Sequence, residues 1–268
     1  LLIGFSLFIL QQAERRGIEN LWFLARDGYL PMAIIRRILE RRGKSGRFNL
    51  NYLSVSRSAM QDVASARAYL NQEGFLRPGR RLIVDTGWRG SLQRSLAHIG
   101  GLPPGDMAGC YLGLWAEALD ADLNPGNAAG YLFSFGAPSA NAIALREAYV
   151  VMELIMSSPH GTVRSYAADA HGRYRPELID ENGVPGLRRR AVFMAMEATC
   201  LNAVDALGDI MGDAWPEAVD PVSALSLLEP VLLRPTRREA AMLNSVPFIN
   251  TDTTGTILTA VNPLPLRE

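Results

Sequence analysis

Two aspartates, Asp27 and Asp85, each follow a short apolar run, and a glycine comes within two residues of each. An arginine lies close to both of them, Arg26 directly before the first and Arg89 four residues after the second. Guanidinium groups bind phosphate and carboxylate groups bidentately. Acids, arginines and glycines in this combination indicate a site for a phosphate, a nucleotide or a sugar phosphate.

A third polar turn, with Ser56 and Arg57, follows another apolar run at residues 51–55. We expect glycines in these turns to let the backbone approach a ligand closely, and the helix N-termini that follow to favour an anion. Besides the two aspartates, the candidate binding residues are Arg26, Gly28, Ser56, Arg57, Thr86, Gly87, Arg89, Gly90, Ser91, Glu153 and His160.

Each of these residues also has a structural interpretation. Asp27 and Asp85 fit helix-capping or turn positions, and Ser56 with Arg57 fits a capped turn with a surface ion pair. Glu153 lies in an apolar segment, where a carboxylate is costly to bury unless it is paired. It is either a partner of a site arginine or a direct ligand contact. His160 is either a turn histidine or an acid–base group.

The elements that must position these residues alternate between apolar runs and amphipathic segments. We predict strands at 20–25, 51–55, 81–84, 109–115 and 129–135, and helices at 1–16, 30–42, 59–70 and 91–99. Continuous apolar runs are typical of strands buried on both faces. The alternation predicts an α/β fold, a three-layer, Rossmann-like, mostly parallel sheet in which the polar turns share the carboxyl edge.

The pattern changes after Pro138. We predict a helix at 141–157, a small β-hairpin of strands 162–167 and 173–178, a long helix at 187–211 and a loosely ordered tail from residue 250. Residues 1–138 are therefore the expected Rossmann-like domain. Residues 139–268 are the expected helical extension, which packs on the first part to give one compact unit.

Composition excludes some classes of protein. The formal net charge is zero, and Lys44 is the only lysine, so a basic nucleic-acid surface is not expected. Cys110 and Cys200 are predicted to be free thiols, which fits a reducing, cytoplasmic location. The apolar residues 1–10 are too short to span a bilayer, and we expect no membrane span. They are interpreted as a core helix of a domain cut from a larger polypeptide, with an upstream domain as partner.

Four runs in the first 180 residues resemble a group of bacterial proteins. They are residues 20–28 (NLWFLARDG), 52–57 (YLSVSR), 83–91 (IVDTGWRGS) and 157–162 (SSPHGT). The group is described as hydrolases of the haloacid dehalogenase (HAD) superfamily and is found with polysaccharide and glycosyltransferase genes. The resemblance implies that this chain is the Rossmann-like domain downstream of a domain with the recognisable phosphatase motifs.

The resemblance also implies roles for individual residues. Asp27 would be the nucleophile or a metal ligand, Ser56 the phosphate-binding hydroxyl, and Asp85 a base or Mg²⁺ ligand. HAD phosphatases carry a second acid two residues after the nucleophile, where this sequence has Tyr29. Lys44 lies in a Gly/Ser-rich loop rather than in a motif position.

A second resemblance is to phosphoribosyltransferases, in which a Thr-Gly loop cradles a phosphate as residues 83–87 could here, although only one acid precedes it. Three functions remain open at this point. They are a hydrolase or transferase acting on a phosphorylated sugar or nucleotide, a non-catalytic binding or scaffold module, and a nucleotide-sugar binder of the glycosyltransferase type. The pair Asp120 and Asp122 superficially matches a two-acid phosphatase motif, but it lies in an apparent loop rather than after an apolar strand. The lack of an Asp-x-Asp at a strand end counts against a metal-dependent glycosyltransferase.

Overall fold

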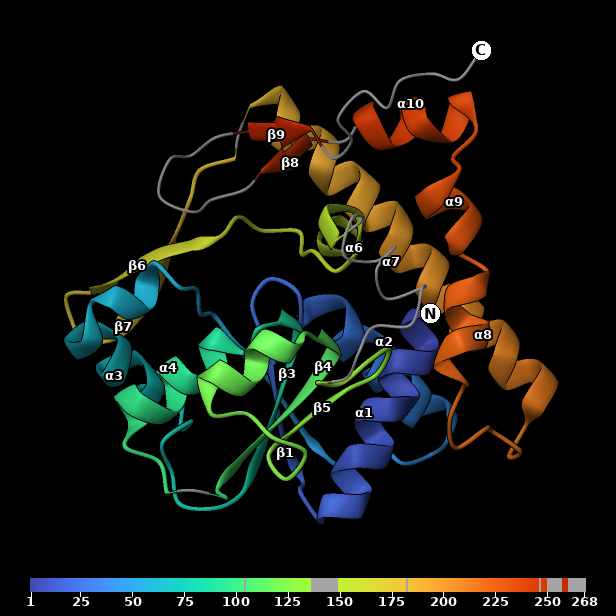
Figure 1. Cartoon of the computed structure of the whole chain (residues 1–268). Helices are drawn as coiled ribbons and strands as arrows, with labels where there is room; N and C mark the ends of the chain where they lie inside the picture. Colours follow the sequence, from blue (N-terminus) through green and yellow to red (C-terminus); the bar gives the residue numbers. More distant parts are fainter. Residues whose placement is uncertain (104, 136–148, 182, 246, 250–256, 260–268) are drawn as a thin grey trace.

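The computed structural model describes residues 1–103, 105–135, 149–181, 183–245, 247–249 and 257–259 (Figure 1). At its centre is a five-stranded sheet in the order β2-β1-β3-β4-β5, and every neighbouring pair is parallel. The strands are β1 (Asn20–Leu24), β2 (Asn49–Leu53), β3 (Arg81–Trp88), β4 (Met107–Leu114) and β5 (Ala128–Gly130). The predicted α/β class with a parallel sheet is confirmed.

Helices cover both faces of the sheet, because successive strand residues point to opposite sides and both sides are apolar. In β1, Leu21 and Phe23 belong to one core cluster, and Trp22 and Leu24 belong to another. The first cluster lies under α1 (Leu2–Arg16) and α2 (Tyr29–Arg41). The second lies under α3 (Val63–Gln72) and α4 (Ser91–Gly100). The result is the three-layer arrangement visible in Figure 1.

The strand order reverses between β1 and β3. From β1 the chain goes to β2 on one side of β1, and β3 then pairs with the other side of β1. In open parallel sheets, ligands bind outside the carboxyl ends of the strands at such a reversal. The residues that follow β1 and those that end β3 are therefore the ones placed at the switch point.

The remaining elements follow the sheet in the sequence. They are η1 (Ala59–Gln61), η2 (Ala116–Ala121), α6 (Tyr149–Ile155), β6 (Val163–Ala168), β7 (Tyr174–Leu178), α7 (Val184–Met211), α8 (Pro221–Ser226), α9 (Glu229–Leu233), α10 (Arg237–Ser245), β8 (Pro247–Ile249) and β9 (Ile257–Thr259). The antiparallel β6–β7 hairpin and the C-terminal helices confirm those predictions. The proposed boundary at 138, most of the helix predicted at 141–157 and most of the tail from residue 250 lie outside the described residues.

Three predicted boundaries are wrong. The turn expected at 85–87 is strand, because β3 continues to pair with β4 as far as Trp88. The helix expected at 59–70 is divided, since the Asp62 side chain accepts a hydrogen bond from the Ser65 amide and starts α3 anew. The fifth strand is only three residues long, and Ser134 beyond it makes an isolated bridge to Leu114.

Helix α7 is long and apolar enough to cross a membrane by length and composition, and it is the one such helix in the described part of the chain. It contacts α2 and buries Phe193 and Val204 in the first core cluster. Most of its length is exposed, including the apolar side chains of Val184, Met194 and Ile210. The absence of a membrane span therefore stays a prediction.

Candidate functional site

Three carboxyl groups from separate segments lie near the switch point, close enough for their charges to interact. Asp27 follows β1, Asp85 lies near the end of β3, and Glu153 comes from α6. Their charges act on one another, since Asp27 raises the pKa of both other groups and Glu153 raises that of Asp85. Two peptide bonds at these strand ends, Ala25–Arg26 and Gly87–Trp88, are cis. The structure thus gathers two predicted acids and one predicted ligand contact.

Asp27 is half-buried and lies beside cationic side chains. Burial raises its pKa, and the charge of Arg26, the hydroxyl of Thr86 and the charge of Arg57 act in the opposite direction. Helix α2 starts at Tyr29 without a side-chain capping bond. Gly28 is the N-cap, and the charge of Asp27 acts on the carboxyl groups of Asp85 and Glu153.

Asp85 is 7% exposed, and its Oδ1 accepts a hydrogen bond of 2.9 Å from the Thr86 amide. Burial raises its pKa well above the ordinary value, and the charges of Asp27 and Glu153 add to the rise. Helix α4 also begins without a side-chain cap. Asp85 is not a capping acid either, so a buried carboxylate is left beside two others.

The pKa of Glu153 lies near neutrality. Burial and the charge of Asp27 raise the pKa of Glu153 to about 7, while a hydrogen bond from Trp88 and the charges of Arg26 and Arg57 oppose the rise. The Trp88 indole Nε1 donates to Glu153 Oε1 over 3.3 Å. A carboxyl group with a pKa near 7 is suited to proton transfer at neutral pH.

The predicted arginines have different surroundings. Arg26 forms an ion pair of 3.6 Å with Glu181, and its side chain is 15% exposed. Arg57 is exposed, yet its charge lowers the pKa of all three carboxyl groups. Arg89 is exposed in the turn after β3, where a ligand contact stays a prediction. Two of the three expected arginines therefore act on the cluster.

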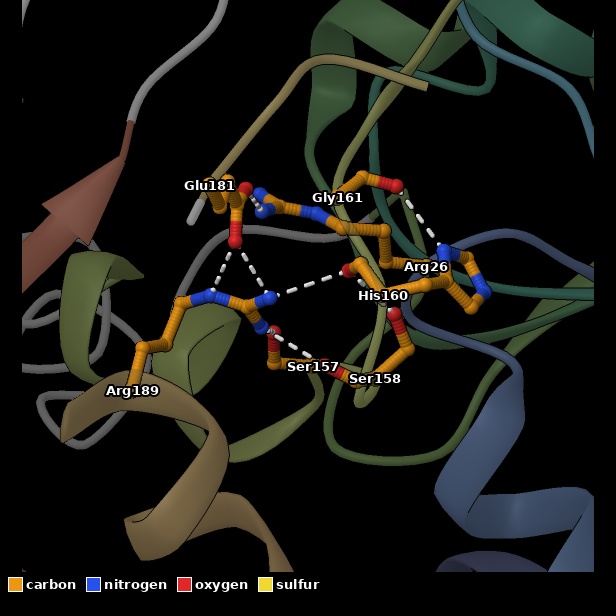
Figure 2. Close-up of polar contacts among 7 residues, drawn as sticks. All are labelled: Arg26, Ser157, Ser158, His160, Gly161, Glu181 and Arg189. Atoms are coloured by element: carbon orange, nitrogen blue, oxygen red, sulfur yellow. Dashed lines mark hydrogen bonds and ion pairs between the residues drawn. The ribbon is translucent and has the colours of Figure 1, made fainter. Parts of the chain in front are cut away.

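A buried arginine, Arg189, contacts the loop at residues 157–161, which follows α6 in the chain (Figure 2). Arg189 Nη1 donates to Ser157 Oγ at 3.0 Å and to the Ser158 carbonyl at 2.6 Å, and Nη2 donates to the His160 carbonyl at 3.0 Å. Its Nε donates to Glu181 Oε2 at 2.7 Å. Because Glu181 also pairs with Arg26, the same carboxylate joins this loop to the site.

His160 is neutral in this arrangement. Its Nδ1 lies 2.8 Å from the Gly161 carbonyl, which can only accept, so Nδ1 carries the proton. Nε2 then accepts from the Tyr52 hydroxyl at 2.7 Å. Burial lowers the pKa of His160, as do the charges of Arg26 and Arg189. Both ring nitrogens are occupied by protein groups, and the acid–base alternative stays a prediction.

Ser56 ties the turn after β2 to the hairpin. Its hydroxyl donates to the Val163 carbonyl at 2.6 Å and accepts from the Ala59 amide at 3.0 Å. This is the capped-turn arrangement that was the alternative to ligand binding. The single hydroxyl hydrogen is used within the protein, so a phosphate could interact with Ser56 only by displacing Val163. Ser91, half-buried, is the first residue of α4.

The three predicted glycines are required by packing within the protein rather than by ligand approach. A Cβ on Gly87, whose φ is +125°, would lie 2.1 Å from the Gly113 carbonyl oxygen. One on Gly28 would lie 2.7 Å from the backbone nitrogen of Leu24. A Cβ on Gly90 would lie 2.0 Å from the side chain of Leu123. Packing alone accounts for these glycines, and a close approach of a ligand to them stays a prediction.

The described residues contain no group of three or more His, Cys, Asp or Glu side chains that could hold a metal ion. The charge of Asp27 raises the pKa of Asp85. Mg²⁺ commonly binds one or two carboxylates and completes its shell with water and substrate oxygens. Asp120 and Asp122 are exposed at η2, away from a strand end.

Four residues of this region were not among the predicted site residues: Tyr52, Trp88, Glu181 and Arg189. Tyr52 and Trp88 lie inside the strand-end runs, and their position beside the polar turns was an available signal. Glu181 lies in the segment between β7 and α7, and Arg189 lies on α7, so only the tertiary fold brings them to the site. Comparison with protein-family models and with curated proteins gives no match for this chain.

Proposed function

We propose that this chain is a HAD-like hydrolase or phosphotransfer domain that acts on a phosphorylated sugar or nucleotide at the switch point. The observation that carries the proposal is the cluster of Asp27, Asp85 and Glu153. Burying like charges together destabilises a fold, and such groups with displaced pKa values concentrate at functional sites. Arg26 and Arg57 supply the positive charge that a phosphoryl group needs.

The reaction that we assign to the cluster has two steps. Asp27 attacks the phosphorus, the bond from phosphorus to the leaving oxygen breaks, and that oxygen takes the proton of Glu153. In the second step Glu153 removes a proton from water. This water attacks the phosphorus of the aspartyl phosphate, which restores Asp27 and releases inorganic phosphate. Asp85 would bind a cation or orient the water.

Glu153 supplies the acid that the sequence lacks at Tyr29. In the structure Tyr29 packs edge-to-face against Tyr52 and Phe193, so it has an aromatic packing role. The pKa of Glu153, about 7, allows it to give a proton in one step and take one in the next. A proton-transfer group from α6 thus replaces the usual position two residues after the nucleophile.

Mg²⁺ is the cofactor that fits this proposal. Asp27 and Asp85 would hold it together with water and phosphate oxygens, and it would supply positive charge to the phosphoryl group. Phosphate release measured with added Mg²⁺ and after chelation tests this directly. Equal rates in both conditions would show that the reaction does not need Mg²⁺. Arg26 and Arg57 would then supply the positive charge for the phosphoryl group.

Phosphate release from a panel of sugar phosphates and nucleotides tests the reaction. Asp27→Asn should lower the rate by a factor on the order of 1000 or more, because it removes the nucleophile. Asp120→Asn, which changes an exposed acid of η2, is the matched control and should keep the wild-type rate. A folded Asp27→Asn protein that releases phosphate as fast as wild type would refute the proposal.

A non-catalytic ligand-binding or scaffold role is the second candidate, and the aromatic packing of Tyr29 favours it. It predicts calorimetric binding of a sugar phosphate or nucleotide with no release of phosphate. The phosphoribosyltransferase-like and glycosyltransferase-associated alternatives have less support. The proposed Thr-Gly loop is part of β3, and Thr86 in it is 1% exposed.

The wider setting is also a proposal. Cys110 is buried on β4 and Cys200 is half-buried on α7, and both are free thiols. Free thiols fit a reducing compartment, which supports a cytoplasmic location. A place in surface polysaccharide biosynthesis and an upstream domain of the same polypeptide follow from the family resemblance.

A further inference from the structure

Helix α7 buries one side and exposes the other. Arg189, Phe193 and Val204 are on the buried side. Because an α-helix has 3.6 residues per turn, the opposite side is formed by residues that recur every three or four positions. We call this side the outer face of α7. Its members, all of them exposed, are Arg188, Ala191, Ala195, Ala198, Thr199, Asn202, Ala206 and Asp209.

Large apolar side chains flank the outer face. Leu187 is 55% exposed, Met194 is 54% exposed and Ile210 is 79% exposed. Residues 191–204 carry a single charged side chain, that of Glu197, which is partly buried. Burying apolar surface is favourable, so an exposed stretch that is poor in charges indicates a surface that a partner covers.

The outer face is complementary to itself when two copies of α7 lie antiparallel. We place the centre of such a pair between Ala198 and Thr199. Residues at equal distances from this centre then lie at the same level, which gives the pairs Ala191–Ala206, Ala195–Asn202 and Arg188–Asp209. Small side chains in the middle of the face allow two helices to approach to about 8 Å, the lower end of the usual range.

The two ends of the outer face carry opposite charges. Arg188 forms no ion pair within the part of the chain that the structure describes. Asp209 accepts a hydrogen bond from Arg41 through Oδ1 alone, and its side chain stays 71% exposed. In the antiparallel pair, Arg188 of each copy lies at the level of Asp209 of the other. A parallel pair would bring Arg188 to Arg188, so the charges favour the antiparallel arrangement.

A lipid surface fits the outer face less well than a second copy does. Asn202 lies near the middle of this face, and Arg188 and Asp209 lie at its ends. Polar and charged side chains are costly to place in hydrocarbon. A partner helix with the opposite order of charges satisfies these groups, and the antiparallel second copy provides that order.

We propose that the outer face of α7 is the interface between two copies of this chain, related by a two-fold axis near Ala198 and Thr199. Each copy contributes a helix of 28 residues, which is about 42 Å long. Two-fold dimers that use the same surface on both subunits are the commonest oligomers. The interface lies on the opposite side of α7 from Arg189 and Phe193, and it is separate from the proposed reaction.

Sedimentation equilibrium over a range of protein concentrations tests the proposal. The mass of wild type should approach twice the 29.3 kDa of one chain as the concentration rises. Ala198→Arg places two bulky cations side by side at the two-fold axis, and it should raise the dissociation constant of the dimer by about 100-fold or more. Ala64→Arg, which changes an exposed alanine of α3, is the matched control and should dimerise as wild type does.

Exchanging the charges at the two ends tests the antiparallel arrangement. Arg188→Glu and Asp209→Arg each bring like charges together at both ends of the pair. Each variant alone should raise the dissociation constant by about tenfold or more. An equimolar mixture of the two should dimerise about as tightly as wild type, because opposite charges then meet again at both ends. Circular dichroism checks that the variants fold, since Asp209→Arg also loses the contact with Arg41.

Three results would overturn the interface. They are a wild type that stays monomeric at every concentration, a dimer as tight in Ala198→Arg as in wild type, and a mixture of the two charge variants that dimerises no better than either one alone. Titration with vesicles of phosphatidylcholine and phosphatidylglycerol identifies the other occupant. A wild type that stays monomeric and binds these vesicles would assign the outer face to a membrane instead.

Discussion

Buried carboxylates at the switch point oppose folding once they ionise. Glu153 is the clearest case, because its pKa rises from 4.5 to about 7 in the folded chain. Burial is the main cause and the neighbouring charge of Asp27 is the second. An acid with a raised pKa is favourable to the folded state while it is protonated. Its contribution to the free energy of unfolding is fully present below the pKa of the unfolded chain. That contribution is lost as the pH rises through the pKa of the folded chain.

Glu153→Gln should therefore change how stability depends on pH. Between pH 4.5 and about 7, wild type should lose up to about 3 kcal/mol of unfolding free energy relative to Glu153→Gln. Urea denaturation of both proteins across this range measures the difference. The lowered pKa of His160 changes stability in the opposite direction over part of this range. Both proteins contain His160, so its effect cancels in the difference between them. Parallel stability curves would show that Glu153 ionises normally.

The same group should control the rate. As the proton donor of the first step, Glu153 must be protonated, so phosphate release should fall as the pH rises above about 7. In Glu153→Gln the rate should be low and its dependence on this ionisation should disappear. Initial rates with one substrate from acidic to basic pH give the result. A wild-type profile retained in Glu153→Gln would assign the proton transfer to another residue.

At the scale of elements, the end of β3 depends on a close approach to β4. Gly87→Ala should lower the free energy of unfolding by roughly 2 kcal/mol or more. The φ of this residue is +125°, and the new Cβ would lie 2.1 Å from the Gly113 carbonyl oxygen. Gly79 has the same φ, and a Cβ there meets nothing within 4 Å, so Gly79→Ala measures the conformational cost alone. Equal losses of unfolding free energy in urea would contradict the close contact.

The buried pair of Glu181 and Arg189 should be a second weak point, since both side chains are 2% exposed. Arg189→Met should lower the free energy of unfolding by about 3–5 kcal/mol, because it leaves Glu181 buried without its main partner. Arg47→Met, which breaks an exposed pair with Glu19, should cost at most about 1 kcal/mol. Chemical denaturation compares the two variants. A loss for Arg189→Met as small as that for Arg47→Met would show that water reaches the pair.

The sequence predicts the boundaries of a helix or strand well where neighbouring residues determine them. The apolar run of β1 and the end of α1, where Gly17 caps the helix with a φ of +60°, have local causes. Both elements agree with the predicted ranges to within two residues. The end of β3 was not, because the polar residues at 85–87 have the composition of a turn. Their strand conformation comes from pairing with β4, which the sequence does not display.

The candidate site shows the same division. Asp27 and Asp85 were predicted to converge, because strand ends of a parallel sheet share one edge. Glu153 was a candidate only through its unusual place in an apolar segment. The Glu181–Arg189 pair was not predicted, since the two residues meet only after α7 packs beside the loop at 157–161.

At the scale of the whole molecule, one core cluster joins the sheet to the C-terminal helices. Leu21 of β1 and Leu82 of β3 share it with Met152 of α6 and with Phe193 and Val204 of α7. Packing on α7 therefore supports the face of the sheet on which α1 and α2 lie. The two predicted parts of the chain are expected to unfold together, although the division at 138 itself stays a prediction.

The most direct test of the account is to look for the phosphoryl group on Asp27. The protein is mixed with a substrate that it hydrolyses and is quenched in acid, and its peptides are examined by mass spectrometry. We expect one phosphoryl group on the peptide that contains Asp27 in wild type, and none there in Asp27→Asn. A phosphoryl group on another residue, or turnover with Asp27 unmodified under conditions that trap such an intermediate, would contradict the central claim.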